Sequence, residues 1–166
     1  MVIRFGGNAS QKKDRGPISR LRLVLADDNK NFVDHMMELL AKTCDMECEV
    51  VGIAADGSSA VELVERLAPD IVTLDITMPR LDGLEVARRL QAAGCQTRVL
   101  ILTVHEDADF LQAALAVGVM GYVVKSQVVS DLPQALGNLV AGHRFVSSTP
   151  NLEASAGDEV EDLDGV

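Results

Sequence analysis

The feature that most constrains the fold of this chain is a regular alternation between short apolar segments and longer amphipathic ones. The short apolar segments lie at residues 21–26, 50–54, 71–74, 99–102 and 121–124. Each is followed by apolar residues at helical spacing, over residues 32–40, 58–67, 84–92, 107–117 and 128–141. Repeated strand–helix units of this kind predict an α/β domain, a (βα)5 fold with a five-stranded parallel sheet and helices on both faces.

The amino-acid composition agrees with a buried sheet. The chain has one Tyr, four Phe and no Trp, so the core must be built from Val, Leu, Ile and Ala, as in parallel sheets covered on both faces. A length of 166 residues suits one domain with tails. We expect a flexible basic segment at residues 1–20, a folded domain at 21–148 and a disordered acidic tail at 149–166.

The charge distribution narrows the partners that the domain could bind. The net charge is −10, and no basic stripe interrupts the acidic body. This pattern argues against direct binding to DNA or RNA, and it is compatible with divalent cations and basic protein partners. No apolar stretch is long enough for a membrane span and no signal peptide is readable, so we expect a cytoplasmic protein.

Chemically reactive side chains follow four of the five predicted strands, at the point where the strand ends, whereas the second strand ends in the chemically plain Ala54-Ala55. Asp27 and Asp28 follow the first strand, Asp75 follows the third, Thr103 the fourth and Lys125 the fifth. In an open parallel α/β sheet, ligands bind just beyond the carboxyl ends of the strands. We therefore expect these side chains to meet at one edge of the sheet.

Three carboxylates that converge on one edge repel each other unless a cation lies between them. Mg²⁺ is the natural candidate, because it prefers oxygen ligands and is usually held by one or two carboxylates plus phosphate and water. Lys125 offers a second cation and Thr103 a hydroxyl donor. An aspartate surrounded by these groups can accept a phosphoryl group, since they neutralise the charge that develops on the transferring oxygens.

These residues, in this order, resemble the receiver domains of bacterial response regulators. The resemblance rests on Asp27-Asp28, on Asp75-Ile76-Thr77-Met78-Pro79 with Asp82-Gly83, on Thr103, and on Tyr122-Val123-Val124-Lys125. It covers the chain from about Leu21 to Ser148 and implies the flavodoxin-like, doubly wound fold. It also implies a phosphorelay protein that takes its phosphoryl group from a sensor histidine kinase or a phosphotransfer protein.

The resemblance also implies a role for each matched position. Asp75 would be the phosphoacceptor, Lys125 would pair with its carboxylate, and Thr103 would hydrogen-bond the phosphoryl group. Mg²⁺ would be held by Asp27, Asp28, Asp75 and the backbone carbonyl of Thr77. Tyr122 would rotate inward as a switch. The protein would be a phosphoacceptor that promotes its own phosphorylation and dephosphorylation, not an enzyme that turns over a separate substrate.

The end of the pattern resembles the NarL/FixJ type of receiver. It rests on Gly121-Tyr122-Val123-Val124-Lys125, a helix, and then Ala141-Gly142-His143-Arg144-Phe145-Val146-Ser147. In that group a linker and a helix-turn-helix DNA-binding domain follow, whereas only a short acidic stretch follows Ser148 here. A stand-alone receiver that switches a downstream output protein and the receiver fragment of a DNA-binding regulator remain alternatives. Whether phosphorylation drives homodimer formation is left open.

Each site residue also has a purely structural interpretation. Asp27 and Asp28 suit helix caps and Asp75 suits a turn. Thr103 suits a strand end, Lys125 a surface position and Tyr122 a packed ring. Their coincidence at successive strand ends favours the functional interpretation. A small Mg²⁺-dependent phosphohydrolase is a further alternative, although the sequence shows no insertion that would form a substrate pocket. His105 lies two residues beyond Thr103, near the expected mouth of the site, where it could influence the lifetime of an acyl phosphate.

Overall fold

A computed structural model of the chain describes residues 20–43 and 46–156. The sheet has six parallel strands in the order β2-β1-β3-β4-β5-β6. In chain order the elements are β1 (Leu21–Ala26), α1 (Lys30–Thr43), β2 (Cys48–Ala54), α2 (Gly57–Leu67), β3 (Ile71–Leu74), α3 (Gly83–Ala92), β4 (Arg98–Thr103), α4 (Ala108–Ala116), β5 (Gly121–Val124), the 3₁₀ turn η1 (Lys125–Gln127), α5 (Val128–Val140), β6 (Phe145–Val146) and α6 (Pro150–Ala156).

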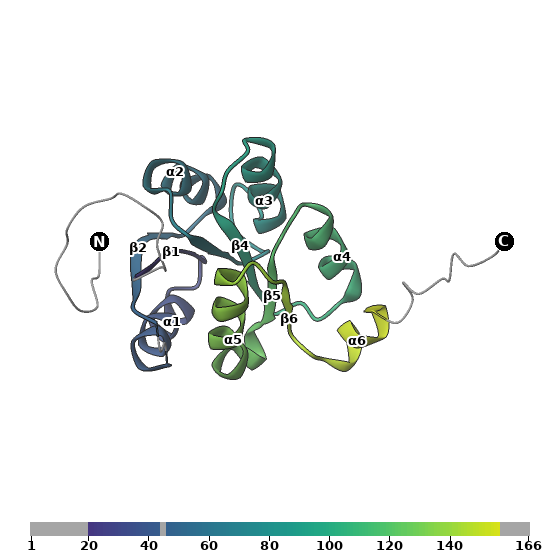
Figure 1. Cartoon of the computed structure of the whole chain (residues 1–166). Coiled ribbons are helices and arrows are strands. Elements are labelled where there is room, and N and C mark those ends of the chain that lie inside the picture. Colours follow the sequence, from purple (N-terminus) through teal and green to yellow (C-terminus); the bar gives the residue numbers. More distant parts are fainter. Residues whose placement is uncertain (1–19, 44–45, 157–166) are drawn as a thin grey trace.

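The helices cover both faces of the sheet, with α1 and α5 on one face and α2, α3 and α4 on the other (Figure 1). Neighbouring residues of each strand point to opposite faces. In β1, for example, Leu23 and Leu25 pack with α1 and α5, while Val24 and Ala26 pack with the helices of the other face. Because both faces are covered, β3 and β5 are buried along their whole length. The expected α/β class and doubly wound arrangement are confirmed.

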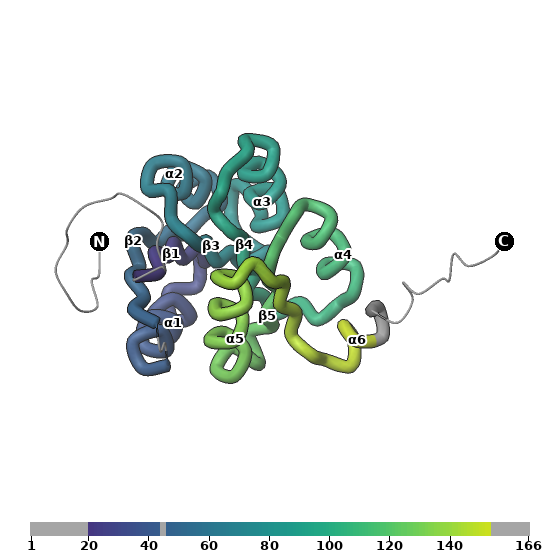
Figure 2. Tube along the Cα trace, viewed as in Figure 1, coloured from purple at the N-terminus to yellow at the C-terminus, as the bar shows by residue number. Residues whose placement is uncertain are grey.

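The strand order places a reversal of direction at the centre of the sheet. From β1 the chain crosses to β2 on one side, then returns to β3 on the other side of β1. The connection that leaves β1 leads to β2 on one side, and the connection that leaves β3 leads to β4 on the opposite side. The loops that follow β1 and β3 therefore turn away from each other. This is the place where ligands bind in open α/β sheets. The tube in Figure 2 follows the chain through β1, β3, β4 and β5 at the middle of the molecule.

The expected strand count of five was wrong, because β6 adds a sixth strand beside β5. The amide of Phe145 donates to the carbonyl of Met120 at 3.1 Å, and that of Ser147 donates to Tyr122 at 2.8 Å. A side-chain network supports this edge: the buried Ser147 hydroxyl donates to Asp131 at 2.5 Å and accepts from the Val124 amide at 3.2 Å. A strand of two residues is too short to show a periodic pattern, so it could not be predicted from hydrophobic spacing.

The expectation of disorder from residue 149 onward was also wrong for its first part. Residues 150–156 form α6, where the side chain of Leu152 is only 2 % exposed and packs in the same core cluster as α4. The backbone and hydroxyl of Thr149 accept the first amides of this turn. The segments expected to be flexible at 1–19 and disordered at 157–166 lie outside the described residues.

None of the helices in the described ranges combines the length and apolarity that a membrane span requires. The longest, α1, has 14 residues and carries charged side chains on its outer face.

Candidate functional site: an acid cluster at the carboxyl end of the sheet

The site begins where β1 and β3 end side by side. The amide of Asp27 donates to the carbonyl of Ala54, and the amide of Asp75 donates to the carbonyl of Ala26, both at 3.0 Å. These two bonds continue the hydrogen-bonding pattern of the sheet one residue beyond the strands. Both backbones are thereby fixed, and both carboxylates lie at the same edge.

Asp28 completes an acid cluster with these two residues. One carboxylate oxygen from each of Asp27, Asp28 and Asp75 lies within 4.8 Å of the others. Asp27 and Asp75 are buried and Asp28 is exposed, so the cluster opens to solvent on one side. Three oxygen donors at this spacing suit a hard divalent cation such as Mg²⁺, which binds few carboxylates and keeps several waters. The residues present therefore fit the metal that the sequence predicted.

Lys125 brings a positive charge to the buried side of the cluster. Its ammonium nitrogen Nζ donates to Asp27 Oδ2 at 2.6 Å and to Asp75 Oδ2 at 3.3 Å. Its side chain is 14 % exposed. A buried carboxylate pair is unfavourable without a compensating charge, and Lys125 supplies it from the end of a third strand, β5.

The environment of Asp75 disfavours its charged form in spite of this lysine. Burial is the main cause and raises the pKa of the Asp75 carboxyl above its ordinary value. The Lys125 ammonium opposes that rise, the neighbouring Asp27 carboxylate adds to it, and the Thr77 backbone lowers the pKa slightly. A carboxylate poorly compensated by its surroundings has more to gain from a bound cation.

Thr103 and Tyr122 are both fully buried and both bind the backbone of one residue, His105. The Thr103 hydroxyl accepts the His105 amide at 3.1 Å, and the Tyr122 hydroxyl donates to the His105 carbonyl at 2.9 Å. The Tyr122 ring therefore lies inside the molecule in this structure. Burial, followed by the charge of Asp107, raises the pKa of Tyr122 far above its ordinary value, so the phenol stays a neutral donor.

The side chain of His105 lies over the loop that follows β3. Its Nε2 is 3.2 Å from the Thr77 hydroxyl, and its ring stacks on Phe110 with the ring centroids 4.2 Å apart. His105 thus connects the loops after β3 and β4, which flank the acid cluster. The sequence placed His105 near the mouth of the site, but no sequence pattern predicted its contacts with Thr77 and Phe110.

Gly83 allows the loop after β3 to fold back beneath Asp75. Its amide donates to the Ile76 carbonyl at 2.8 Å. A Cβ atom built on Gly83 would lie 2.2 Å from the Asp75 carbonyl oxygen, a backbone atom that cannot give way. The resemblance rests in part on Asp82-Gly83, and this close approach is the physical reason for a glycine at position 83.

Phe32 is a neighbour of the site that the sequence did not predict. Its ring lies beneath the Lys125 ammonium, with Nζ 4.2 Å from the ring centroid. In the sequence Phe32 is only one of several apolar residues at helical spacing in α1. A contact between the first helix and the residue that follows β5 is visible only in three dimensions, because 93 positions separate Phe32 and Lys125 along the chain.

Comparison with known proteins gives consistent matches. Residues 23–137 match the family model of the response regulator receiver domain. The chain is 32 % identical over 128 residues to the transcriptional regulatory protein DegU of Brevibacillus brevis, covering 77 % of this chain and 53 % of DegU. It is 33 % identical over 135 residues to the nitrate/nitrite response regulator NarL of Escherichia coli K12, covering 80 % of this chain and 62 % of NarL.

Solved structures agree with the sequence relatives. A LuxR-family two-component response regulator from Aurantimonas matches with a TM-score of 0.76 and 32 % identity, over 86 % of this chain and all of that one. The receiver domain of the putative response regulator NarL from Mycobacterium tuberculosis matches with a TM-score of 0.71 and 30 % identity, over 75 % of this chain and 99 % of that one.

The chain spans between about half and two thirds of the length of the curated relatives named above. Those relatives are transcriptional and response regulators. The family model covers most of the chain, and the two solved structures are each matched over nearly their whole length. This chain therefore belongs to the response regulator receiver domain family of two-component systems.

Proposed function

We propose that this chain is a phosphorelay receiver that accepts a phosphoryl group on Asp75 in a Mg²⁺-dependent reaction. The observation that carries the proposal is the meeting of three carboxylates and one ammonium at the carboxyl edge of the sheet. Asp75 directly follows the inner strand β3, and the Lys125 ammonium donates to Asp75 as well as to Asp27.

In the proposed reaction, a carboxylate oxygen of Asp75 attacks the phosphorus of a phosphohistidine. The P–O bond to Asp75 forms as the P–N bond to imidazole breaks, and the imidazole leaves with its electron pair and takes a proton. Mg²⁺, held by Asp27, Asp28, Asp75 and the Thr77 carbonyl, would supply positive charge to the transferring oxygens.

The chain's own residues complete the charge balance. Lys125 already touches Asp75 Oδ2 and would transfer its contact to a phosphoryl oxygen. Thr103 would exchange its bond with the His105 amide for one with the phosphoryl group. Because Tyr122 binds the carbonyl of that same His105, a change at Thr103 would reach Tyr122 through one residue.

The proposed partners are a sensor histidine kinase or a phosphotransfer protein as the donor and an output protein, or a second copy of the receiver, as the target. A groove beside the acid cluster fits a donor protein. It is lined by Asp27, Asp28 and Val33 and by the exposed Ile53, among others. Apolar area next to reactive groups is where a partner could hold its phosphohistidine.

A second candidate is that the chain is the receiver part of a DNA-binding regulator. Its support is that the relatives are transcriptional regulators of which the chain spans only part. The length of the natural reading frame distinguishes this candidate from a stand-alone receiver. Both candidates share the proposed chemistry at Asp75.

Incubation with acetyl phosphate and Mg²⁺ tests the proposal, with the product followed by intact mass. We expect the native chain to gain one phosphoryl group and the Asp75→Asn variant to gain none. Asp109→Asn is the matched control, because Asp109 is an exposed aspartate in the first turn of α4. The proposal fails if Asp75→Asn is labelled as well as the control, or if labelling is unchanged when Mg²⁺ is removed with EDTA.

A further inference from the structure

The environment of the Lys125 ammonium has three sides. Two are carboxylate oxygens, Asp27 Oδ2 at 2.6 Å and Asp75 Oδ2 at 3.3 Å. The third is the face of the Phe32 ring, whose centroid lies 4.2 Å from Nζ. An ammonium has three donors and no acceptor, and an aromatic face attracts a cation within about 6 Å of the ring centroid. The Phe32 ring therefore attracts the Lys125 ammonium as well as covering its third side.

The position of this ring is linked to the acid cluster. The second carboxylate oxygen of Asp27, Oδ1, accepts the Asn29 amide at 2.8 Å, and the Asn29 side chain accepts the Phe32 amide at 3.2 Å. Asn29 thus caps α1, and the first turn of this helix is fixed to Asp27. One carboxylate oxygen of Asp27 thus accepts a hydrogen bond from the Lys125 ammonium. The other accepts the Asn29 amide, and Asn29 in turn fixes the backbone of Phe32, whose ring lies against the ammonium.

Lysine needs such support because its charge lies at the end of a flexible stem. Without a third contact, the Lys125 ammonium would be free to settle on Asp27, to which its hydrogen bond is shorter. In the proposed reaction, however, the ammonium has to be available to Asp75 and then to the phosphoryl oxygen. A contact that carries no negative charge can confine the ammonium without competing for it as a third carboxylate would.

We propose that Phe32 is a positioning residue for phosphoryl transfer: its ring face, stacked against the Lys125 ammonium, confines that charge between Asp27 and Asp75. The inference rests on the proposed function of Asp75. It assigns to the first turn of α1 a role that capping and core packing do not require, since an aliphatic side chain would satisfy both. Phe32 acts through Lys125 and does not touch the reacting atoms.

Stepwise fluorination of the ring at position 32 tests this proposal. Fluorine atoms withdraw electrons from the ring face and weaken its attraction for a cation, while the shape of the side chain hardly changes. In the full chain, phosphorylation by acetyl phosphate at saturating Mg²⁺ should slow with each added fluorine, by about 2- to 5-fold in total for a trifluorinated ring. The same series at Phe145, a half-buried ring on β6, is the matched control and should leave the rate unchanged.

A second pair of variants provides an independent check. Phe32→Leu keeps an apolar side chain that favours a helix but removes the ring, and it should be phosphorylated more slowly than the native protein. Phe32→Tyr keeps the ring face and should be phosphorylated at the native rate. Melting temperatures that stay constant across the fluorinated series would show that packing is preserved. Equal rates for all fluorinated proteins, or for Phe32→Leu and Phe32→Tyr, would overturn the proposal for Phe32 while labelling of Asp75 continued. Absence of labelling in the native protein would instead contradict the proposed function itself.

Discussion

At the scale of single residues, the site is an arrangement of charges that are only partly balanced. Asp27 has both carboxylate oxygens engaged, one by Lys125 and the other by the Asn29 amide. Asp75 has the longer of the two contacts with Lys125, and its burial raises its pKa. The carboxylate proposed as the nucleophile is therefore the less well compensated of the two.

The acid pair, the threonine and the lysine could be predicted from the sequence because each follows a recognisable strand. The role of Phe32 and the contacts of His105 could not, although the position of His105 near the mouth of the site could. Phe32 contacts Lys125 although 93 positions separate them in the sequence. His105 contacts Thr103 and Tyr122 through its backbone as well as other residues through its ring. Neither kind of contact leaves a pattern in the sequence, because it depends on how distant loops meet after folding.

Removal of the Asp75 charge should stabilise the protein in a pH-dependent way. The native pKa of Asp75 is raised above the ordinary carboxyl value of 3.8. The contribution of Asp75 to the stability of the native protein is therefore fully present below pH 3.8. It is lost as the pH rises through the raised pKa of the native protein. We expect Asp75→Asn to have a higher melting temperature than the native protein at pH 7 in EDTA, and to lose this advantage below about pH 4.

Thermal melts across this pH range, with Asp109→Asn as the control, measure the effect. A gain that is the same at every pH would show that the stabilisation does not come from the Asp75 charge. Saturating Mg²⁺ should reduce the advantage at pH 7, because a cation bound to the carboxylates stabilises only the native protein.

His105 should control how long a phosphoryl group stays on Asp75. Its ring contacts Thr77 and Phe110 and covers the loops beside the acid cluster. We expect His105→Ala to admit water and to speed dephosphorylation several-fold, since shielding a reactive intermediate from water slows its hydrolysis. Decay of the phosphorylated form after removal of acetyl phosphate measures the rate. His143→Ala, at an exposed position beyond α5, is the control, and equal decay of the two variants would refute this role.

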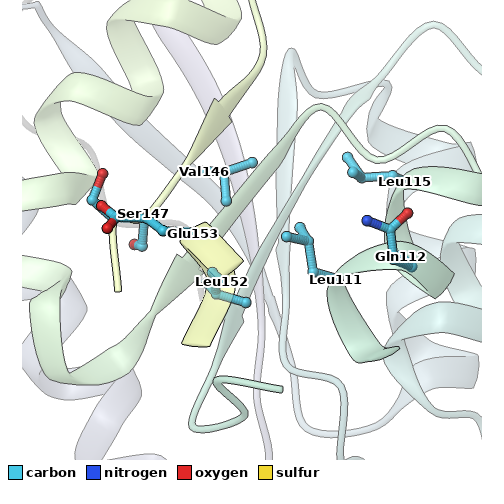
Figure 3. A pocket seen from close by; sticks show the side chains of 8 residues that line it. Leu111, Gln112, Leu115, Val146, Ser147, Leu152 and Glu153 are labelled. Carbon is cyan, nitrogen blue, oxygen red and sulfur yellow. The ribbon is translucent and has the colours of Figure 1, made fainter. Parts of the chain in front are cut away.

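At the scale of elements, the last part of the chain extends the domain beyond its five strand–helix units. β6 adds a strand to the edge of the sheet beside β5, and α6 places Leu152 against α4. Figure 3 shows the side chains of Leu152 and Leu111 pointing toward one another in a pocket that Val146 and Leu115 also line. The volume of this pocket is about 310 Å³. The five repeated units were predictable from hydrophobic spacing. The added edge was not, because its strand is too short and its helix lies in an acidic segment whose composition suggested disorder.

Leu152 should make a measurable contribution to the stability of the domain. It is 2 % exposed, and large-to-small substitutions in a core cost about 2–5 kcal/mol. We expect Leu152→Ala to lower the free energy of unfolding by about 2 kcal/mol, at the lower end because the side chain already borders a cavity. Urea unfolding measures it, with the exposed Glu153→Ala as the control, which should change stability by less than about 0.5 kcal/mol. Equal stabilities would mean that α6 is not held against α4.

At the scale of the whole molecule, the fold explains why the reactive groups meet. The strand order reverses direction at β1 and β3, and the same edge receives the ends of β4 and β5. Residues far apart in the sequence, such as Asp27 and Lys125, become hydrogen-bonded partners. Membership of the receiver family and the doubly wound sheet were both predictable, because the spacing of strand ends is itself the signal. The chain's partners are not encoded in that spacing.

The most direct test of the central claim is to locate the acyl phosphate chemically. Borohydride converts a phosphorylated aspartate to homoserine, and peptide mass spectrometry identifies the converted residue. After treatment with acetyl phosphate and Mg²⁺, we predict homoserine at position 75 and aspartate at positions 27 and 28. Homoserine at either of those positions, or at none of the three, would contradict the assignment of Asp75 as the phosphoacceptor.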